Sequence, residues 1–399
     1  NLAEQHHRIR RARAPARDPD APPQRGSLEA IFRAARAAGA SAARVREALR
    51  ELEVTLTLTA HPTQAVRRTL LDKLDRIARV LEERDRCEPT PQEAADLDAR
   101  VREEIGALWQ TDEVRRARPS VGDEVKNVLW YVEEVLWDRI PELQQALVAA
   151  FEKVWGEPLG FLPMPLRLHS WVGGDMDGNP LVTAEVLEDA IRAHRARALR
   201  RYLVEVRRLG GALSQSSRYV RVPPRLLASL AEDERRMPEV AARFASRTEG
   251  EPWRRKLRFV EARIAAALAC VEERRMARRP PDATRLVSRL AGGGPALPGG
   301  SEPDAVGSAR SILDFAYRTP VELVDDLETI ARSLEEAGAR KAGLRRVLAL
   351  LAKVRALGFH ILELELRAPA EDARAAAAWL DDGAPPTEGG MRFFEALQR

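Results

Sequence analysis

The stretch TLTLTAHPTQAVRRTLLDKLDRI, residues 55–77, joins a strand pattern to a helix pattern. Thr and Leu alternate over its first five residues, which indicates a β-strand over 54–59. A His–Pro pair follows, and then an arginine-rich segment whose apolar residues recur at helical spacing, which predicts a helix over 64–86. A titratable imidazole, His61, is therefore expected where a strand ends and a basic helix begins.

Two more short strands are predicted, over 166–172 and 358–366, and long helical patterns separate the three. These helical patterns cover 91–115, 121–137, 184–209, 223–245, 251–278, 308–337 and 341–357. The alternation suits neither a doubly wound sheet nor a simple bundle. It predicts a mainly α protein with a β/α (TIM-type) barrel, incomplete and with large helical insertions. In such barrels the chemistry lies where strands end and loops begin.

The predicted organisation has four parts: an N-terminal helical segment (1–53), the first barrel strands with helical insertions (54–278), a flexible loop (279–307) and a last part with the third strand (308–399). The loop is assigned from its GGG and PGG runs and its prolines. The chain begins with Asn and ends within a helical pattern, so we expect it to be a piece of something longer.

Composition excludes several classes of protein. The 399 residues carry a formal charge of only +4, with acids and bases interleaved, and no stretch mixes basic and aromatic residues as a nucleic-acid groove would. The two cysteines lie far apart within helical patterns, which favours a reducing compartment and a cytoplasmic location. No apolar run approaches the ~18 residues of a membrane span. Neither nucleic acid nor membrane is an expected partner.

The segment around His61 contains several groups that can bind an anion. A helix start offers free N–H groups, and Arg67 and Arg68 can grip a phosphate or carboxylate. An imidazole with a pKa near 6.5 can move protons at neutral pH. The segment thus indicates proton transfer beside an anion. The alternative is a buried His that only ties strand to helix.

A second constellation, WVGGDMDGNP at 171–180, follows the second predicted strand. A calcium loop starting at Asp175 fails, because Pro180 and Val186 stand where Gly and Glu are required. A rigid active-site loop and an ordinary tight turn remain, and the first is favoured by the group Gly173, Gly174, Asp175, Asp177 and Asn179. Arg367 ends the third predicted strand. Its side chain could face the same end of the barrel as His61, or it could lie on the surface.

The other histidines are not expected to take part in the chemistry. His194 lies in a charged helical pattern and is expected to be solvated, whereas His169 and His360 are expected to pack on short strands. His6 and His7 are adjacent in sequence, so on a helix their side chains would point in different directions and could not bind one metal ion. No metal site is therefore expected in this chain.

Several of these segments resemble phosphoenolpyruvate carboxylase. The carrying motifs are NLAEQHHRIRR (1–11), TLTAHPTQAVRRTLLDK (57–73), the helical stretch 108–137, SWVGGDMDGNP (170–180), SILDFAYRTP (311–320) and GFHILELELR (358–367). The TAHPT motif is highly specific to that family, SWVGGDMDGNP resembles its SW-x-GGDRDGNP motif, and the resemblance extends over most of the chain.

The resemblance implies a carboxy-lyase of carbon dioxide fixation and oxaloacetate metabolism, feeding the tricarboxylic acid cycle. Phosphoenolpyruvate and bicarbonate would give oxaloacetate and phosphate with Mg²⁺ or Mn²⁺, in a homotetramer. It implies that His61 takes a proton from carboxyphosphate and that Arg367 helps hold the anions. The metal ligands and the Gly-rich catalytic loop are expected in a missing carboxyl-terminal half, so this amino-terminal half alone should be inactive.

Two departures from the family pattern stand out. Met176 replaces the usual Arg of the GGDRDGNP motif, and Ala-Pro-Ala follows Arg367 in place of a Gln and a small polar residue. These departures leave open a catalytically inactive helical scaffold that binds an anion or a partner. The His–Pro pair beside arginines is also compatible with a phosphohistidine transfer protein that has His61 as nucleophile.

Overall fold

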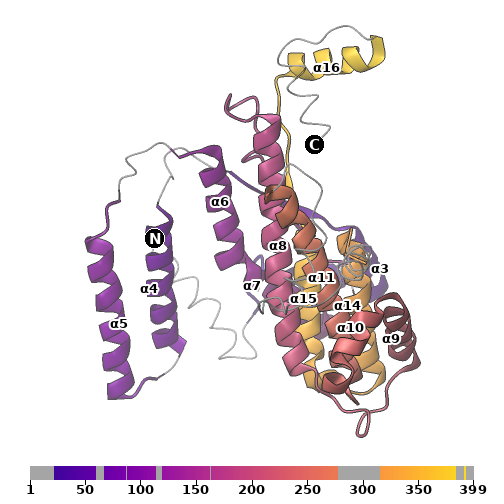
Figure 1. Cartoon of the computed structure of the whole chain (residues 1–399). Helices are drawn as coiled ribbons and strands as arrows, with labels where there is room; N and C mark the ends of the chain where they lie inside the picture. Colours follow the sequence, from indigo (N-terminus) through magenta and orange to yellow (C-terminus); the bar gives the residue numbers. More distant parts are fainter. Residues whose placement is uncertain are drawn as a thin grey trace, which may run out of the picture. The chain divides into compact units, whose positions relative to one another are not determined.

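The computed structural model describes residues 22–59, 67–86, 88–113, 119–161, 163–276, 315–382 and 391. Most of these residues are helical (Figure 1). In chain order the elements are α2 (Leu28–Ala37), α3 (Ala42–Glu51), β1 (Val54–Leu58), α4 (Arg68–Arg86), α5 (Pro91–Trp109), α6 (Val121–Tyr131), the π-helical turn η2 (Val132–Leu136), α7 (Trp137–Trp155), β2 (Leu166–Ser170), α8 (Ala184–Ala212), α9 (Pro224–Arg236), α10 (Pro238–Phe244), the 3₁₀ turn η3 (Ser246–Thr248), α11 (Pro252–Met276), α14 (Pro320–Glu336), the π-helical turn η4 (Arg340–Leu344), α15 (Arg345–Leu357), β3 (Glu363–Leu364) and α16 (Ala370–Asp382).

The described strands form one parallel sheet in the order β1-β2-β3. The backbone N–H of Val54 donates to the Pro165 carbonyl, and the N–H of Glu365 donates to the Ser170 carbonyl at 2.9 Å. The buried Ser170 hydroxyl donates to the Leu58 carbonyl at 2.7 Å. The three expected strands are confirmed as a small open sheet. These three strands leave the sheet open, so they do not by themselves form the expected barrel.

The third strand is much shorter than the expected 358–366. Residues before Glu363 form a turn instead, in which Gly358 has φ +52° and Ile361 has φ +62°. The Ile361 side chain is fully buried. A left-handed residue cannot continue a strand, and burial of a β-branched side chain offsets its backbone strain.

The described chain divides into two compact units. The first contains residues 1–56, 132–169 and 191–363, and its core lies where α14 packs against α11 and α15 and where α7 packs against α2 and α15 (Figure 1). Its largest fully buried side chains include Trp137, Trp253, Tyr202, Tyr317 and Phe151. The four-part division predicted from the sequence stays a prediction, and its loop 279–307 lies outside the described residues.

A buried ion cluster ties three helices of this first unit together. Lys256 of α11 is 1% exposed and lies 2.6 Å from both Asp233 of α9 and Asp326 of α14. Arg263, about two turns further along α11, pairs with Asp326 and Glu322. Burying a charge is unfavourable unless it is paired, so these groups specify how α9, α11 and α14 meet.

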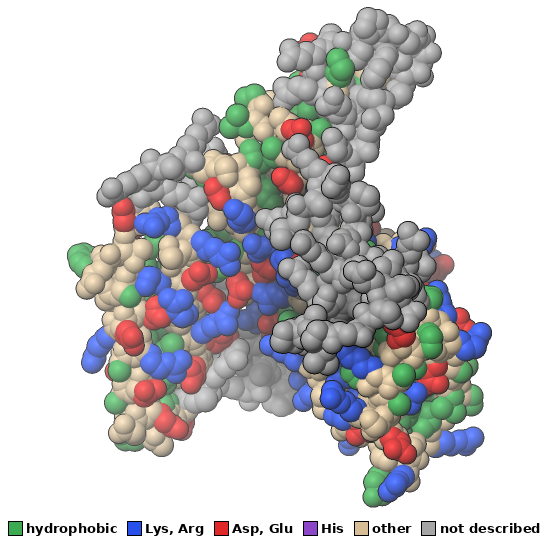
Figure 2. All heavy atoms as spheres, viewed as in Figure 1, with side chains coloured by type: hydrophobic (Ala, Val, Ile, Leu, Met, Phe, Trp, Pro, Cys, Tyr) green, Lys and Arg blue, Asp and Glu red, His purple; other side chains and the backbone are tan. Residues whose placement is uncertain are grey.

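The second unit contains residues 57–131, 170–190 and 364–399. Its α4 and α5 lie side by side as a hairpin (Figure 1). Thr90 and Glu93 form a capping box that starts α5. Ion pairs such as Arg76–Glu104 and Arg84–Asp98 cross between the helices, and Figure 2 shows the interspersed basic and acidic side chains.

Helix boundaries differ from expectation in two places. The helix expected over 121–137 passes through η2 into α7 and ends only at Trp155. The helix expected over 223–245 is broken into α9 and α10 at Pro238, which cannot supply a backbone N–H. Within the described residues, no helix combines the length and apolar character needed to span a bilayer.

Candidate active site

The basic segment after β1 is only partly described. His61 lies outside the described residues. Arg67 precedes α4 and donates from Nη1 to the Asp112 carbonyl at 2.6 Å, which ties the start of α4 to the chain beyond α5. Arg68 opens α4, and its Nε lies 4.0 Å from the Asp72 carboxylate, with half of its side chain exposed. Their role as anion ligands stays a prediction.

The structure brings Arg367 together with the glycine-rich loop after β2. The backbone N–H of Arg367 donates to the Gly174 carbonyl at 2.9 Å, and the N–H of Met176 donates to the Arg367 carbonyl at 2.8 Å. Asp175 and Arg367 thereby form a parallel bridge beyond the regular sheet. Two motifs almost 200 residues apart in sequence thus meet at the same edge of the sheet, at the carboxyl ends of their strands.

Two glycines allow this close approach. Gly173 has φ +94°, and a Cβ there would lie 2.9 Å from the Ala190 Cβ and 3.0 Å from a Val125 methyl. A Cβ on Gly174 would overlap the carbonyl oxygen of Glu365. Both glycines are buried. The loop therefore needs glycine at these positions for geometric reasons, which favours a rigid loop over an exposed turn.

The polar residues of the loop are held by local backbone contacts. The Asn179 N–H donates to the Asp175 carbonyl at 3.1 Å, and the Asn179 side-chain oxygen accepts from the Leu181 N–H at 3.0 Å. The Asp175 carboxylate lies over Gly178, where a Cβ would overlap it. Asp177 is exposed, whereas Asp175 and Asn179 are half-buried. Asp177 is thus the loop carboxylate most open to solvent.

The guanidinium of Arg367 stacks on an aromatic ring and pairs with a carboxylate. Its Cζ lies 3.6 Å from the Trp171 ring centre, and its Nη2 lies 3.0 Å from Glu365 Oε2. The Arg367 side chain is still 44% exposed, so donors remain for another anion. Sequence reasoning did not single out Trp171 or Glu365. The alternation in 363–367 carried a signal, because residues two apart on a strand share a face.

No divalent-metal site is present among the described residues. No group of three or more His, Cys, Asp or Glu side chains is placed to hold an ion in that part of the chain. The acids of the 171–180 loop therefore do not by themselves make up the ligand set that Mg²⁺ prefers.

His194 is buried, which corrects the expectation that it is solvated. It is 2% exposed, and burial lowers its pKa to about 4, against a hydrogen bond to the Leu362 backbone that raises it. His360 lies in the turn before β3 rather than on the strand, and burial also lowers its pKa to about 4. The 358–362 turn lies against α8, because the Leu362 backbone bonds to His194 and the Tyr202 hydroxyl donates to the Gly358 carbonyl at 2.7 Å. Helix periodicity does not reveal this contact.

Comparison with known proteins gives a consistent result. The family model described as phosphoenolpyruvate carboxylase matches residues 1–382. A phosphoenolpyruvate carboxylase of Xanthomonas campestris pv. campestris is 35% identical over 367 residues, covering 92% of this chain and 36% of that protein. One from Nocardia farcinica is 37% identical over 373 residues, covering 93% of this chain and 36% of its own length.

A more distant relative covers nearly the whole chain. The phosphoenolpyruvate carboxylase of Rhodopseudomonas palustris is 32% identical over 397 residues, or 99% of this chain and 38% of that protein. The chain therefore spans a little over a third of the length of the curated relatives it matches.

Proposed function

Since the chain belongs to the phosphoenolpyruvate carboxylase family, we propose that it is part of an enzyme that carboxylates phosphoenolpyruvate with bicarbonate to give oxaloacetate and phosphate. The observation that carries the proposal is the family match across residues 1–382, which includes both the TAHPT segment and the loop that meets Arg367. Because the relatives are about two and a half times as long, the 399-residue chain alone is expected to be inactive.

The proposed roles follow from charge and position. Bicarbonate attacks the phosphorus of phosphoenolpyruvate, which gives carboxyphosphate and an enolate. His61 takes the proton of carboxyphosphate, carbon dioxide is released, and the enolate attacks it. Arg367 would hold an anionic reactant with the donors left exposed beside Trp171, and Arg67 and Arg68 would add positive potential. The glycine-rich loop at 173–179 would keep Arg367 in register.

Further properties of the whole protein belong to the same proposal. The three-stranded sheet would be the start of a TIM-type barrel completed by residues beyond this chain, which would also supply the Mg²⁺ or Mn²⁺ ligands. A cytoplasmic homotetramer is the expected assembly.

The test uses the longer polypeptide that contains this chain, assayed for oxaloacetate by a malate dehydrogenase coupled reaction. We expect product only when both bicarbonate and phosphoenolpyruvate are present, and a loss of at least about 100-fold in His61→Asn, the usual scale for a lost general base. Circular dichroism of the variant checks that it folds.

Two other results would replace the proposal. Acid-labile phosphate on His61 after incubation with phosphoenolpyruvate would indicate a phosphohistidine protein. No oxaloacetate from the folded, unsubstituted polypeptide would indicate an inactive scaffold.

A further inference from the structure

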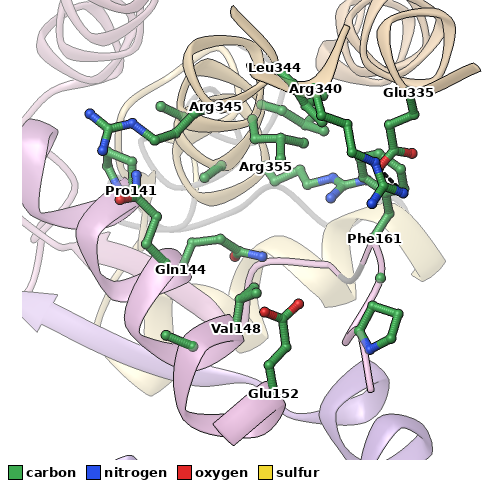
Figure 3. A pocket seen from close by; sticks show the side chains of 18 residues that line it. Pro141, Gln144, Val148, Glu152, Phe161, Glu335, Arg340, Leu344, Arg345 and Arg355 are labelled. Atoms are coloured by element: carbon green, nitrogen blue, oxygen red, sulfur yellow. Dashed lines mark ion pairs between the residues drawn. The ribbon is translucent and has the colours of Figure 1, made fainter. Parts of the chain in front are cut away.

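The first unit contains a cavity of about 360 Å³ between α7 and the facing η4–α15 segment (Figure 3). This volume lies in the range of small-molecule sites in proteins. None of its lining residues belongs to the candidate active site. Whatever the cavity does is therefore separate from the proposed chemistry of His61 and Arg367.

The walls of the cavity are mainly apolar. Val148 of α7, Phe161 of the following loop, and Leu344 and Leu348 of the η4–α15 segment all line it. Ala349 and Ala352 lie on the same wall, and their small side chains help leave the space open. A ligand with an apolar or aromatic body would bury its surface here.

Three arginines line the same space, and they differ in how well they are neutralised. Arg355 pairs with Glu328 at 2.5 Å, and Arg340 lies 3.6 Å from Glu335. Arg345 is exposed and has no carboxylate at ion-pair distance among the described residues. Among the three arginines, the one without a paired carboxylate is therefore Arg345, which suits a ligand carboxylate. The acids of the lining are Glu335, which pairs with Arg340, and Glu152 near the end of α7.

The lining also contains a buried acceptor for which the described residues provide no donor. The side-chain oxygen of Gln144 is buried and has no hydrogen-bond partner among them. Figure 3 shows the Gln144 side chain extending from α7 into the space faced by the arginines of the opposite segment. An unsatisfied buried acceptor is unfavourable, so a ligand hydroxyl that donates to it would be stabilised.

We propose that this cavity is a binding site for a small amphipathic carboxylate with a hydroxyl group at its other end. The apolar body lies against Phe161 and Leu348, the carboxylate binds Arg345, and the hydroxyl donates to the Gln144 oxygen. An aromatic hydroxy acid has all three features.

Three related small molecules separate the contribution of the carboxylate to binding from that of the hydroxyl. p-Hydroxyphenylacetate carries both polar groups, phenylacetate lacks the hydroxyl, and tyrosol replaces the carboxylate with an alcohol. Ligand-observed NMR titrations of the 399-residue chain give a dissociation constant for each. We expect p-hydroxyphenylacetate to bind about three-fold to ten-fold more tightly than either analogue, as one hydrogen bond or one charge contact would give.

Variants of the lining assign the effect to single residues. Arg345→Gln should weaken both carboxylates about ten-fold and leave tyrosol unchanged. Arg346→Gln is the matched control, because Arg346 is exposed on the same helix but does not line the cavity. Gln144→Leu should make p-hydroxyphenylacetate and phenylacetate bind equally, and Ala349→Phe should abolish binding by filling the space.

Thermal unfolding of each variant checks that it is folded. The proposal is overturned if none of the probes binds the unsubstituted chain, if folded Ala349→Phe binds as well as the unsubstituted chain, or if Arg346→Gln weakens carboxylate binding as much as Arg345→Gln.

Discussion

Arg367 and Trp171, from two loops that follow different strands, stack with the guanidinium carbon 3.6 Å from the ring centre. The contact lies at the edge of the sheet where the backbone of Arg367 is also paired with the glycine-rich loop. A stacked guanidinium has its plane fixed while its N–H donors stay available, which suits the binding of an anion.

Removing this guanidinium should affect catalysis far more than folding. In the longer polypeptide, Arg367→Gln is expected to lower kcat/KM for phosphoenolpyruvate at least about ten-fold, the cost of one charge-assisted bond. The free energy of unfolding should change by less than about 1 kcal/mol, because the Arg367–Glu365 pair is partly exposed. Arg33→Gln, at an exposed pair within α2, is the control and should change neither quantity. Unchanged kinetics in Arg367→Gln would remove Arg367 from the anion site.

The loop glycine at 173 should be intolerant of even one added carbon. Gly173→Ala places a Cβ against Ala190 and Val125 at a φ of +94°, so we expect a loss of at least about 1–3 kcal/mol in the free energy of unfolding. Gly106→Ala is the matched control. Gly106 lies inside α5 with nothing near its added Cβ, and alanine there should stabilise by about 0.5–1 kcal/mol. Urea unfolding followed by circular dichroism measures both, and equal shifts would contradict the steric argument.

The buried Lys256 should contribute to stability through its two carboxylates. Lys256→Met leaves Asp233 and Asp326 facing each other without their shared cation, and we expect a loss of about 3–5 kcal/mol. Lys126→Met removes an exposed pair with Asp123 and should cost less than about 1 kcal/mol. Denaturant midpoints compare the two variants, and a Lys256→Met protein as stable as Lys126→Met would show that the cluster adds nothing.

Two histidines with lowered pKa values, the buried His194 and the half-buried His360, should make the protein less stable in mild acid. His194 and His360 have folded-state pKa values of about 4, below the unfolded value near 6.5. The unfolded chain therefore binds protons first, so stability is complete above pH ~6.5 and falls as the pH drops toward ~4. The loss should be on the order of 2–3 kcal/mol per ring. Nearby Arg195 and Arg197 act in the same direction.

The double variant His194→Gln/His360→Gln tests this assignment. Its stability, measured by urea unfolding at several pH values and normalised to neutral pH, should vary less between pH ~6.5 and ~4 than that of the unsubstituted chain. An unchanged pH slope would mean that other groups control the acid response.

Much of the fold could be predicted because it depends on local patterns. The alternation of Thr and Leu before His61 marks β1, and helical spacing marks α4, α5, α8 and α11. The third strand was overestimated because the alternation of Leu and Glu at 362–366 was extended back to residue 358, across Ile361, which turns left-handed. The candidate site was found as separate motifs, since no local pattern shows that Gly174 and Arg367 share hydrogen bonds.

The sequence by itself determined where strands end, which glycines and charged residues follow them, and to which family the motifs belong. Only the tertiary structure decided that Arg367 stacks on Trp171 and that His194 is buried beneath the 358–362 turn. It also decided that a cavity lies beside α7, lined by a Gln144 oxygen that has no partner within the described part of the chain. The physical reason is that periodicity reports which face of an element is apolar, whereas the path of the whole chain decides what covers that face.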